Sequence, residues 1–194
     1  MRPLTEALAP ISAAYASTTT LAAIRAAHPC EGGWRKLLRH LGKTAADDES
    51  LPLLTVLDSK GLDDALWVLS KAMPDDRLAR HFGAWCAEQV LHLFEAERPE
   101  DMRPRQAIAV ARDDDATEEQ RAAAGAAAWA AAEAAARVAA GAAAWAAARA
   151  AAGTAAGTAA RAARAAARAA WAAADAGAAT RAAQEKQLRI MLAE

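Results

Sequence analysis

Three side chains that can bind a metal ion, His81, Cys86 and His92, fall within one predicted helix. The two histidines are eleven residues apart and share a face, because each helical residue turns the chain by about 100°. Cys86 lies about 140° away from them on the helical wheel, and no second Cys or His follows at ligand spacing. The pattern favours partly buried side chains of an amphipathic helix over a zinc site.

A second group that suggests chemistry is the pair His28 and Cys30, which flank Pro29. A thiol activated by an imidazole needs a third group that orients the imidazole, and none is identifiable near this turn. The glycines of "GTAAGT", residues 153–158, lack the strand, the lysine and the spacing of a phosphate-binding loop. The sequence therefore predicts no catalytic residue, no metal site and no cofactor.

Acidic residues gather in four clusters, which are Asp47, Asp48 and Glu49; Asp63 and Asp64; Asp75 and Asp76; and Asp113, Asp114 and Asp115. Three of the clusters lie where helices are predicted to begin, and carboxylates there offset the positive end of the helix dipole. The alternative is an acidic surface that binds a partner. The candidate residues for such a surface are Asp47, Asp48, Glu49, Asp113, Asp114 and Asp115.

Arginines form a stripe in the alanine-rich second half of the chain. Arg161, Arg164, Arg168 and Trp171 are spaced by three and four residues, so they share one face of a predicted helix. Residues 121–194 carry 9 Lys+Arg and 4 Asp+Glu, a net charge of +5, whereas residues 1–120 carry 14 and 20, a net charge of −6. The spacing is too wide and the charge too low for a typical DNA-binding tail, which disfavours nucleic acid.

Short helices are predicted to position these groups in the first half. Thr18, Thr19 and Thr20 offer N-caps to a helix over 21–27, and Gly42 closes a helix over 31–41. Pro52 and Gly61 bracket a third helix, and a fourth runs from 61 to 73 with Asp63 and Asp64 in its first turn. A longer apolar stripe from 75 to 97 indicates the core helix, and 105–112 forms a further short helix.

The alanine-rich half begins with Thr117 and Gln120, which match a capping box. Alanine has the highest helix propensity, and the glycines within 153–158 predict a break between two segments of about 35 residues. We expect Gly125–Gly153 and Thr158–Leu192 to form an antiparallel hairpin, packed closely through alanine and docked on the 75–97 helix. Trp129, Trp145 and Trp171 would anchor it.

The predicted fold is therefore all-α. A bundle of short helices with an acidic surface, residues 1–116, packs against a long alanine-rich antiparallel helical hairpin, residues 117–194, in one compact unit. The chain opens without a signal peptide, and arginines recur through the alanine-rich half, which excludes a membrane span there. With only Cys30 and Cys86 present, a disulfide framework is not expected. These features predict a cytoplasmic protein.

Four segments together resemble the alanine-rich immunity proteins of bacterial polymorphic toxin systems, the fifth immunity-protein family, which also occurs in phages. They are "GLDDALWVLSKAM", "HFGAWCAEQVLHLFEAERPEDMRPRQAIAVAR", the "AAWAAA" field and "QEKQLRIML", and they span roughly residues 60 to 194. The resemblance implies an all-helical protein that neutralises a toxin or nuclease by binding it. It implies no catalytic residues, and no motif of this family fixes the binding residues.

The leading functional hypothesis is a non-enzymatic protein inhibitor, either an immunity protein or a phage-encoded antagonist of a host defence nuclease such as a CRISPR effector. Its acidic part would imitate nucleic acid, or its helices would pack directly on the target. The alternative is a nucleic-acid-associated protein that uses the arginine and tryptophan stripe, with an affinity for DNA that falls steeply as salt rises. The identity of the target and the oligomeric state stay open.

Overall fold

A computed structural model describes residues 15–134 and 177–193 of the chain. Helices dominate these residues, which confirms the predicted all-α class. They are α1 (Leu21–Ala26), α2 (Glu31–Leu41), α3 (Leu53–Lys60), α4 (Leu62–Lys71), α5 (Arg77–Glu95), α6 (Arg103–Arg112), α7 (Glu118–Ala134) and α10 (Gly177–Ala193). None of them is long and apolar enough to cross a membrane.

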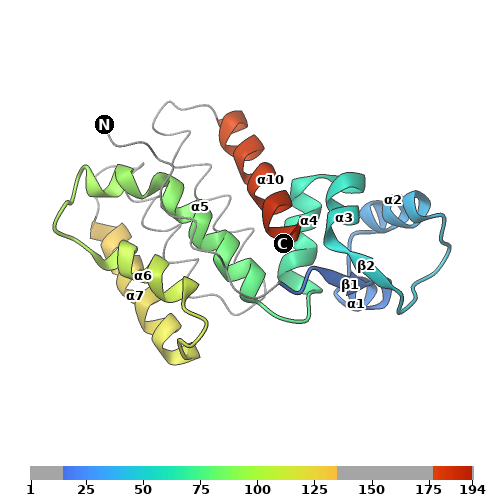
Figure 1. The fold of residues 1–194 in the computed structure, drawn as a ribbon, viewed down its shortest axis with the longest axis horizontal. Coiled ribbons are helices and arrows are strands. Elements are labelled where there is room, and N and C mark those ends of the chain that lie inside the picture. The colour runs from blue at the N-terminus through green and yellow to red at the C-terminus, as the bar shows by residue number, and fades with distance from the viewer. Residues whose placement is uncertain (1–14, 135–176, 194) are drawn as a thin grey trace.

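Helix α5 runs through the middle of the molecule (Figure 1). Helices α1 to α4 gather beyond its N-terminal end, whereas α6 runs back alongside α5 and α7 packs on α6. The C-terminal helix α10 lies against α5 and α3. Ion pairs join α10 to the N-terminal half, because Arg181 lies 2.5 Å from Asp63 and Arg189 lies 2.6 Å from Asp58.

The N-terminal half also contains two short strands, which the sequence patterns did not predict. Strand β1 (Thr18–Thr20) pairs antiparallel with β2 (Ser50–Pro52), and Thr19 stands opposite Leu51. Three residues are too few to show the alternation of apolar and polar residues that marks a longer strand. Thr20 still serves as the expected N-cap of α1, since its hydroxyl oxygen accepts a hydrogen bond from the amide of Ala23 at 3.0 Å.

The local signals for helix ends operate as predicted. Gly42 ends α2 in the left-handed conformation, with φ of 66°, and its amide reaches the carbonyls of the last turn. The Thr117 hydroxyl accepts from the amide of Gln120 at 3.1 Å, and the Gln120 side chain accepts from the amide of Thr117 at 2.7 Å. This reciprocal pair is the capping box, and it starts α7 at Glu118.

The core is built around α5, which is buried on most of its surface. Its apolar residues Leu78, Phe82 and Phe94 are almost completely excluded from solvent. Gln89, which the 75–97 periodicity placed on the buried stripe, is exposed instead. Arg80, by contrast, is buried, and the apolar pattern gave no sign of this, whereas His81, which was expected to be partly buried, is only 7% exposed.

Close alanine packing is present in the described part of the alanine-rich half. Ala128 and Ala131 of α7 are fully buried, as are Ala107 and Ala111 of α6, the helix on which α7 mainly packs. Trp129 is partly buried against the same core. The predicted turn at 153–158, Trp145 and Trp171 lie outside the described residues, so the hairpin itself stays a prediction.

We predict that Ala131→Leu lowers the free energy of unfolding by about 1 to 3 kcal/mol, because the added carbons have no space between closely packed helices. The matched control is Ala130→Leu on the same helix, where the side chain is exposed and the change should be close to neutral. Urea unfolding followed by circular dichroism measures both. Equal stabilities for the two variants would mean that α7 is not closely packed at Ala131.

Candidate functional site

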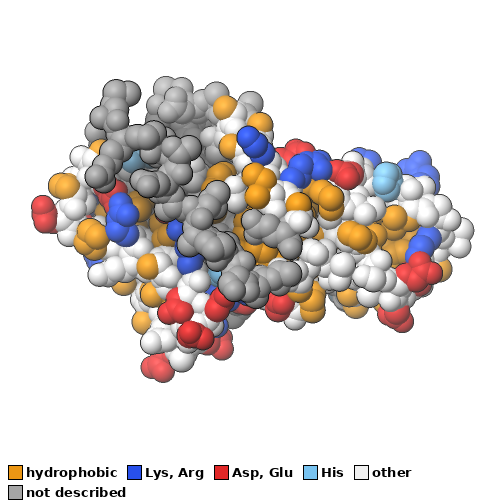
Figure 2. Space-filling model, in the orientation of Figure 1, with side chains coloured by type: hydrophobic (Ala, Val, Ile, Leu, Met, Phe, Trp, Pro, Cys, Tyr) orange, Lys and Arg blue, Asp and Glu red, His pale blue; other side chains and the backbone are white. Residues whose placement is uncertain are grey.

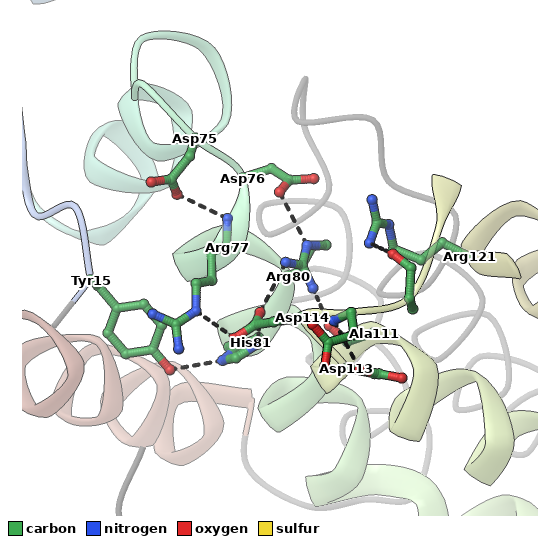
Figure 3. A network of polar contacts seen from close by, with 12 residues as sticks. Tyr15, Asp75, Asp76, Arg77, Arg80, His81, Ala111, Asp113, Asp114 and Arg121 are labelled. Atoms are coloured by element: carbon green, nitrogen blue, oxygen red, sulfur yellow. Dashed lines mark hydrogen bonds and ion pairs between the residues drawn. The ribbon is translucent and has the colours of Figure 1, made fainter. Parts of the chain in front are cut away.

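One predicted partner-binding residue, Asp114, lies at the centre of a polar network between α5 and the α6–α7 turn (Figure 3). Its Oδ1 atom is 3.1 Å from Nη2 of Arg80 and 3.1 Å from Nε2 of His81. Its Oδ2 atom is 2.6 Å from Nε of Arg77. Three side chains from two successive turns of α5 therefore converge on one carboxylate.

Arg80 is the most deeply buried charged group in this network, with 4% of its surface exposed. Its guanidinium also donates to Asp76 Oδ1 at 3.1 Å and to the backbone carbonyl of Ala111 at 2.8 Å. A buried cation is tolerated only when its N–H donors find acceptors. Asp76, Ala111 and Asp114 supply these acceptors, and two of them come from the end of α6 and the turn that follows it.

His81 links the network to the segment that precedes β1. The ionised carboxylate of Asp114 can only accept, so Nε2 of His81 donates to it. Nδ1 of the neutral ring then accepts a hydrogen bond from the Tyr15 hydroxyl at 2.9 Å. The guanidinium of Arg77 lies over the Tyr15 ring, 5.2 Å from its centroid. Burial lowers the pKa of His81, although the charge of Asp114 acts in the opposite direction.

The electrostatic state of Asp114 follows from the same contacts. Partial burial acts to raise its pKa, but the hydrogen bond from Arg77, the charge that His81 carries when protonated and the hydrogen bond from Arg80 outweigh it. The pKa of Asp114 is therefore lowered, and the carboxylate is ionised at neutral pH. Tyr15 and His81 are only 6% and 7% exposed. The tyrosine, histidine and aspartate thus join three segments of the chain, and of the three only the Asp114 side chain, which is 41% exposed, reaches solvent.

The neighbours of Asp114 have a different environment. Asp113 and Asp115 are exposed, as are Glu118 and Glu119 in the first turn of α7. Within the described residues none of these four carboxylates has an ion-pair partner, and we call the group the acidic turn. Figure 2 shows acidic side chains gathered at this end of the molecule, where α6 meets α7. Residues 117–120 were predicted only to start a helix, so Glu118 and Glu119 were missed as surface charges.

The other predicted acidic residues lie in the loop between α2 and β2. Asp47 and Glu49 both contact Nζ of Lys43 at 2.6 Å, and Asp48 is exposed. The hydrogen bond to Lys43 lowers the pKa of Asp47. Figure 1 places this loop and the acidic turn at opposite ends of the molecule, so the structure does not bring the two predicted clusters together.

The predicted basic stripe, Arg161, Arg164, Arg168 and Trp171, lies outside the described residues. The candidate metal ligands do not converge, since Cys86 is buried and His92 is exposed on the same helix. Burial raises the pKa of the Cys86 thiol, which leaves it protonated and unreactive. Cys30 is the N-cap of α2, and its Sγ atom accepts from the amide of Gly33 at 3.3 Å.

The described residues thus define an all-α protein with an internal arginine–histidine–aspartate network and an exposed acidic turn beside it. No protein-family model, curated protein or solved structure matches the chain. The function of the chain is therefore inferred from its own residues and from the resemblance over residues 60 to 194.

We predict that Asp114→Asn lowers the free energy of unfolding by about 1 to 3 kcal/mol, because it leaves the buried Arg80 with one charged partner fewer. Asp113→Asn and Asp115→Asn are matched controls, because they remove the same charge from exposed carboxylates that pair with no arginine, lysine or histidine of the described residues. Each should change stability by less than about 0.5 kcal/mol. If urea unfolding gives the same free energy of unfolding for all three variants, Asp114 has no special structural role.

The lowered pKa of His81 predicts how stability changes with pH. In the unfolded chain the imidazole has its ordinary pKa of 6.5, so on acidification the unfolded state binds the proton first. The free energy of unfolding should be insensitive to His81 above that pH and should fall as the pH drops below it. The lowered pKa of Asp114 adds a further loss only below its ordinary value of 3.8.

Urea unfolding between about pH 7.5 and pH 5 measures this dependence, with His81→Gln as the comparison. The variant removes the titrating group, so its stability should decline less over the same interval. An identical decline in both proteins, or a wild-type protein that becomes more stable on acidification, would contradict the assignment.

Proposed function

We propose that this chain is a non-enzymatic protein inhibitor that binds its target directly. The target would be a toxin, or a defence nuclease such as a CRISPR effector, and the chain would act as an immunity protein or a phage-encoded antagonist in the cytoplasm. The resemblance over residues 60 to 194 supports this function. The structural observation that carries it is the acidic turn, whose exposed carboxylates are not neutralised by the rest of the described chain.

The acidic turn has the properties expected of a surface that meets a positively charged partner. Nucleases bind the phosphate backbone through lysine and arginine, and clustered carboxylates are attracted to the same field. The capping box orders the start of α7, and the Asp114 network holds the preceding turn against α5. A surface that is already ordered loses less conformational entropy on binding.

The structure also ranks the predicted acidic residues. Asp113 and Asp115 are exposed and form no ion pair with the described residues, whereas Asp114 is neutralised by Arg77 and Arg80. Asp47 and Glu49 share the charge of Lys43. The proposed binding surface therefore consists of Asp113, Asp115, Glu118 and Glu119. Asp114 contributes indirectly, because its contacts with α5 hold the turn in place.

The test begins with affinity capture from cells that express the genes neighbouring this one, followed by kinetics with the purified partner. The test variant combines Asp113→Asn, Asp115→Asn, Glu118→Gln and Glu119→Gln. We predict that its association rate with the partner falls about tenfold at low salt and depends less on salt, because long-range attraction is lost. The partner's toxic or nuclease activity should be inhibited by the wild-type chain.

The matched control is the double variant Asp48→Asn and Glu49→Gln, which removes acidic charge at the opposite end of the molecule and should associate like the wild type. A partner that binds all three proteins with the same rate and salt dependence would exclude the acidic turn as the contact surface. Retention of DNA at moderate salt, without a protein partner, would instead favour the nucleic-acid alternative.

A further inference from the structure

A cavity of about 180 Å³ lies at the end of the molecule remote from the acidic turn, between α2, α3 and α4. Its walls are largely apolar and include two indole rings, those of Trp34 and Trp67, together with Val56. An apolar cavity of roughly 150 Å³ is large enough to bind benzene. The space therefore matches a molecule with a single six-membered ring.

One end of this cavity is polar and is formed by Lys60. The Lys60 side chain is only 8% exposed, and its Nζ atom forms an ion pair with Asp64 Oδ2 at 2.8 Å. An ammonium group has three N–H donors. Among the described residues Asp64 is the only polar partner of Lys60, so the buried ammonium has donor capacity left for a further acceptor at the cavity.

The first turn of α2 adds positive potential at the same place. A Cβ atom on Gly33 would stand 2.5 Å from Nζ of Lys60 and 3.0 Å from Sγ of Cys30, so the glycine allows the ammonium to lie against the helix. The N-terminus of a helix carries a partial positive charge. The Lys60 ammonium therefore lies at the positive end of α2, where a cation is disfavoured. Within the described residues its charge is balanced by one carboxylate, that of Asp64, whose side chain is 45% exposed.

We propose that this cavity binds a small aromatic carboxylate. The ring lies between the side chains of Trp34 and Trp67, where its apolar surface is removed from water. The carboxylate accepts hydrogen bonds from Lys60 at the first turn of α2, and the half-exposed Asp64 side chain moves into solvent. The ammonium thus exchanges a carboxylate that is 45% exposed to water for one enclosed with it in the cavity.

The probe for this site is benzoate, titrated into the full chain labelled with ¹⁵N and followed through the indole N–H signals in NMR spectra. We expect saturable shifts of the Trp34 and Trp67 signals, with the Trp129 signal unchanged. Lys60→Met should weaken benzoate binding about tenfold or more, because a charge-assisted hydrogen bond is lost. Lys71→Met, which removes an exposed lysine outside the cavity, should leave the affinity unchanged.

Asp64→Asn tests the same site without removing a buried group, so it decides the matter even if Lys60→Met does not fold. The amide is a weaker competitor for Lys60, and we expect benzoate to bind severalfold more tightly to this variant. Benzamide, which has the same shape without the charge, should bind more weakly than benzoate to the wild type. Absence of saturable shifts, equal binding of benzamide, or weaker binding by Asp64→Asn would each overturn the proposal.

Discussion

The structure depends on a constraint that α5 imposes. This helix has more buried residues than any other described helix, yet it carries Arg80 and His81 at positions that are almost inaccessible to solvent. A cation in such surroundings is tolerated only if its donors are satisfied and its charge is balanced. The turn between α6 and α7 meets this requirement through Asp114 and the carbonyl of Ala111, so the position of that turn is coupled to the core.

The same constraint distinguishes the three consecutive aspartates. All three are exposed, but only Asp114 is directed toward Arg77, Arg80 and His81 and contacts them, whereas Asp113 and Asp115 have no ion pair within the described residues. The contacts of Asp114 with α5 therefore hold the α6–α7 turn in place, and Asp113 and Asp115 on that turn stay available at the surface. The two ends of the molecule consequently differ in chemistry. One end carries the acidic turn, and the other contains an apolar cavity with a buried lysine.

Sequence patterns predicted the features that depend on near neighbours in the chain. The end of α2 at Gly42, the capping box at Thr117 and the extent of α5 were all predictable, because each is decided within one or two helical turns. The Asp114 network was not, because its tertiary contacts join residues 31 to 66 positions apart. The pairing of β1 with β2 and the exposure of Gln89 were missed for the same reason, since tertiary contacts decide them.

A double-mutant cycle between Arg80 and Asp114 tests this account most directly. The free energy of unfolding is measured for the wild type, Arg80→Met, Asp114→Asn and the double variant at neutral pH. If the buried arginine determines the position of the turn, the two substitutions are strongly non-additive, with a coupling energy of about 1 to 3 kcal/mol. A coupling energy below about 0.5 kcal/mol would mean that the turn is held independently of Arg80 and would contradict the account.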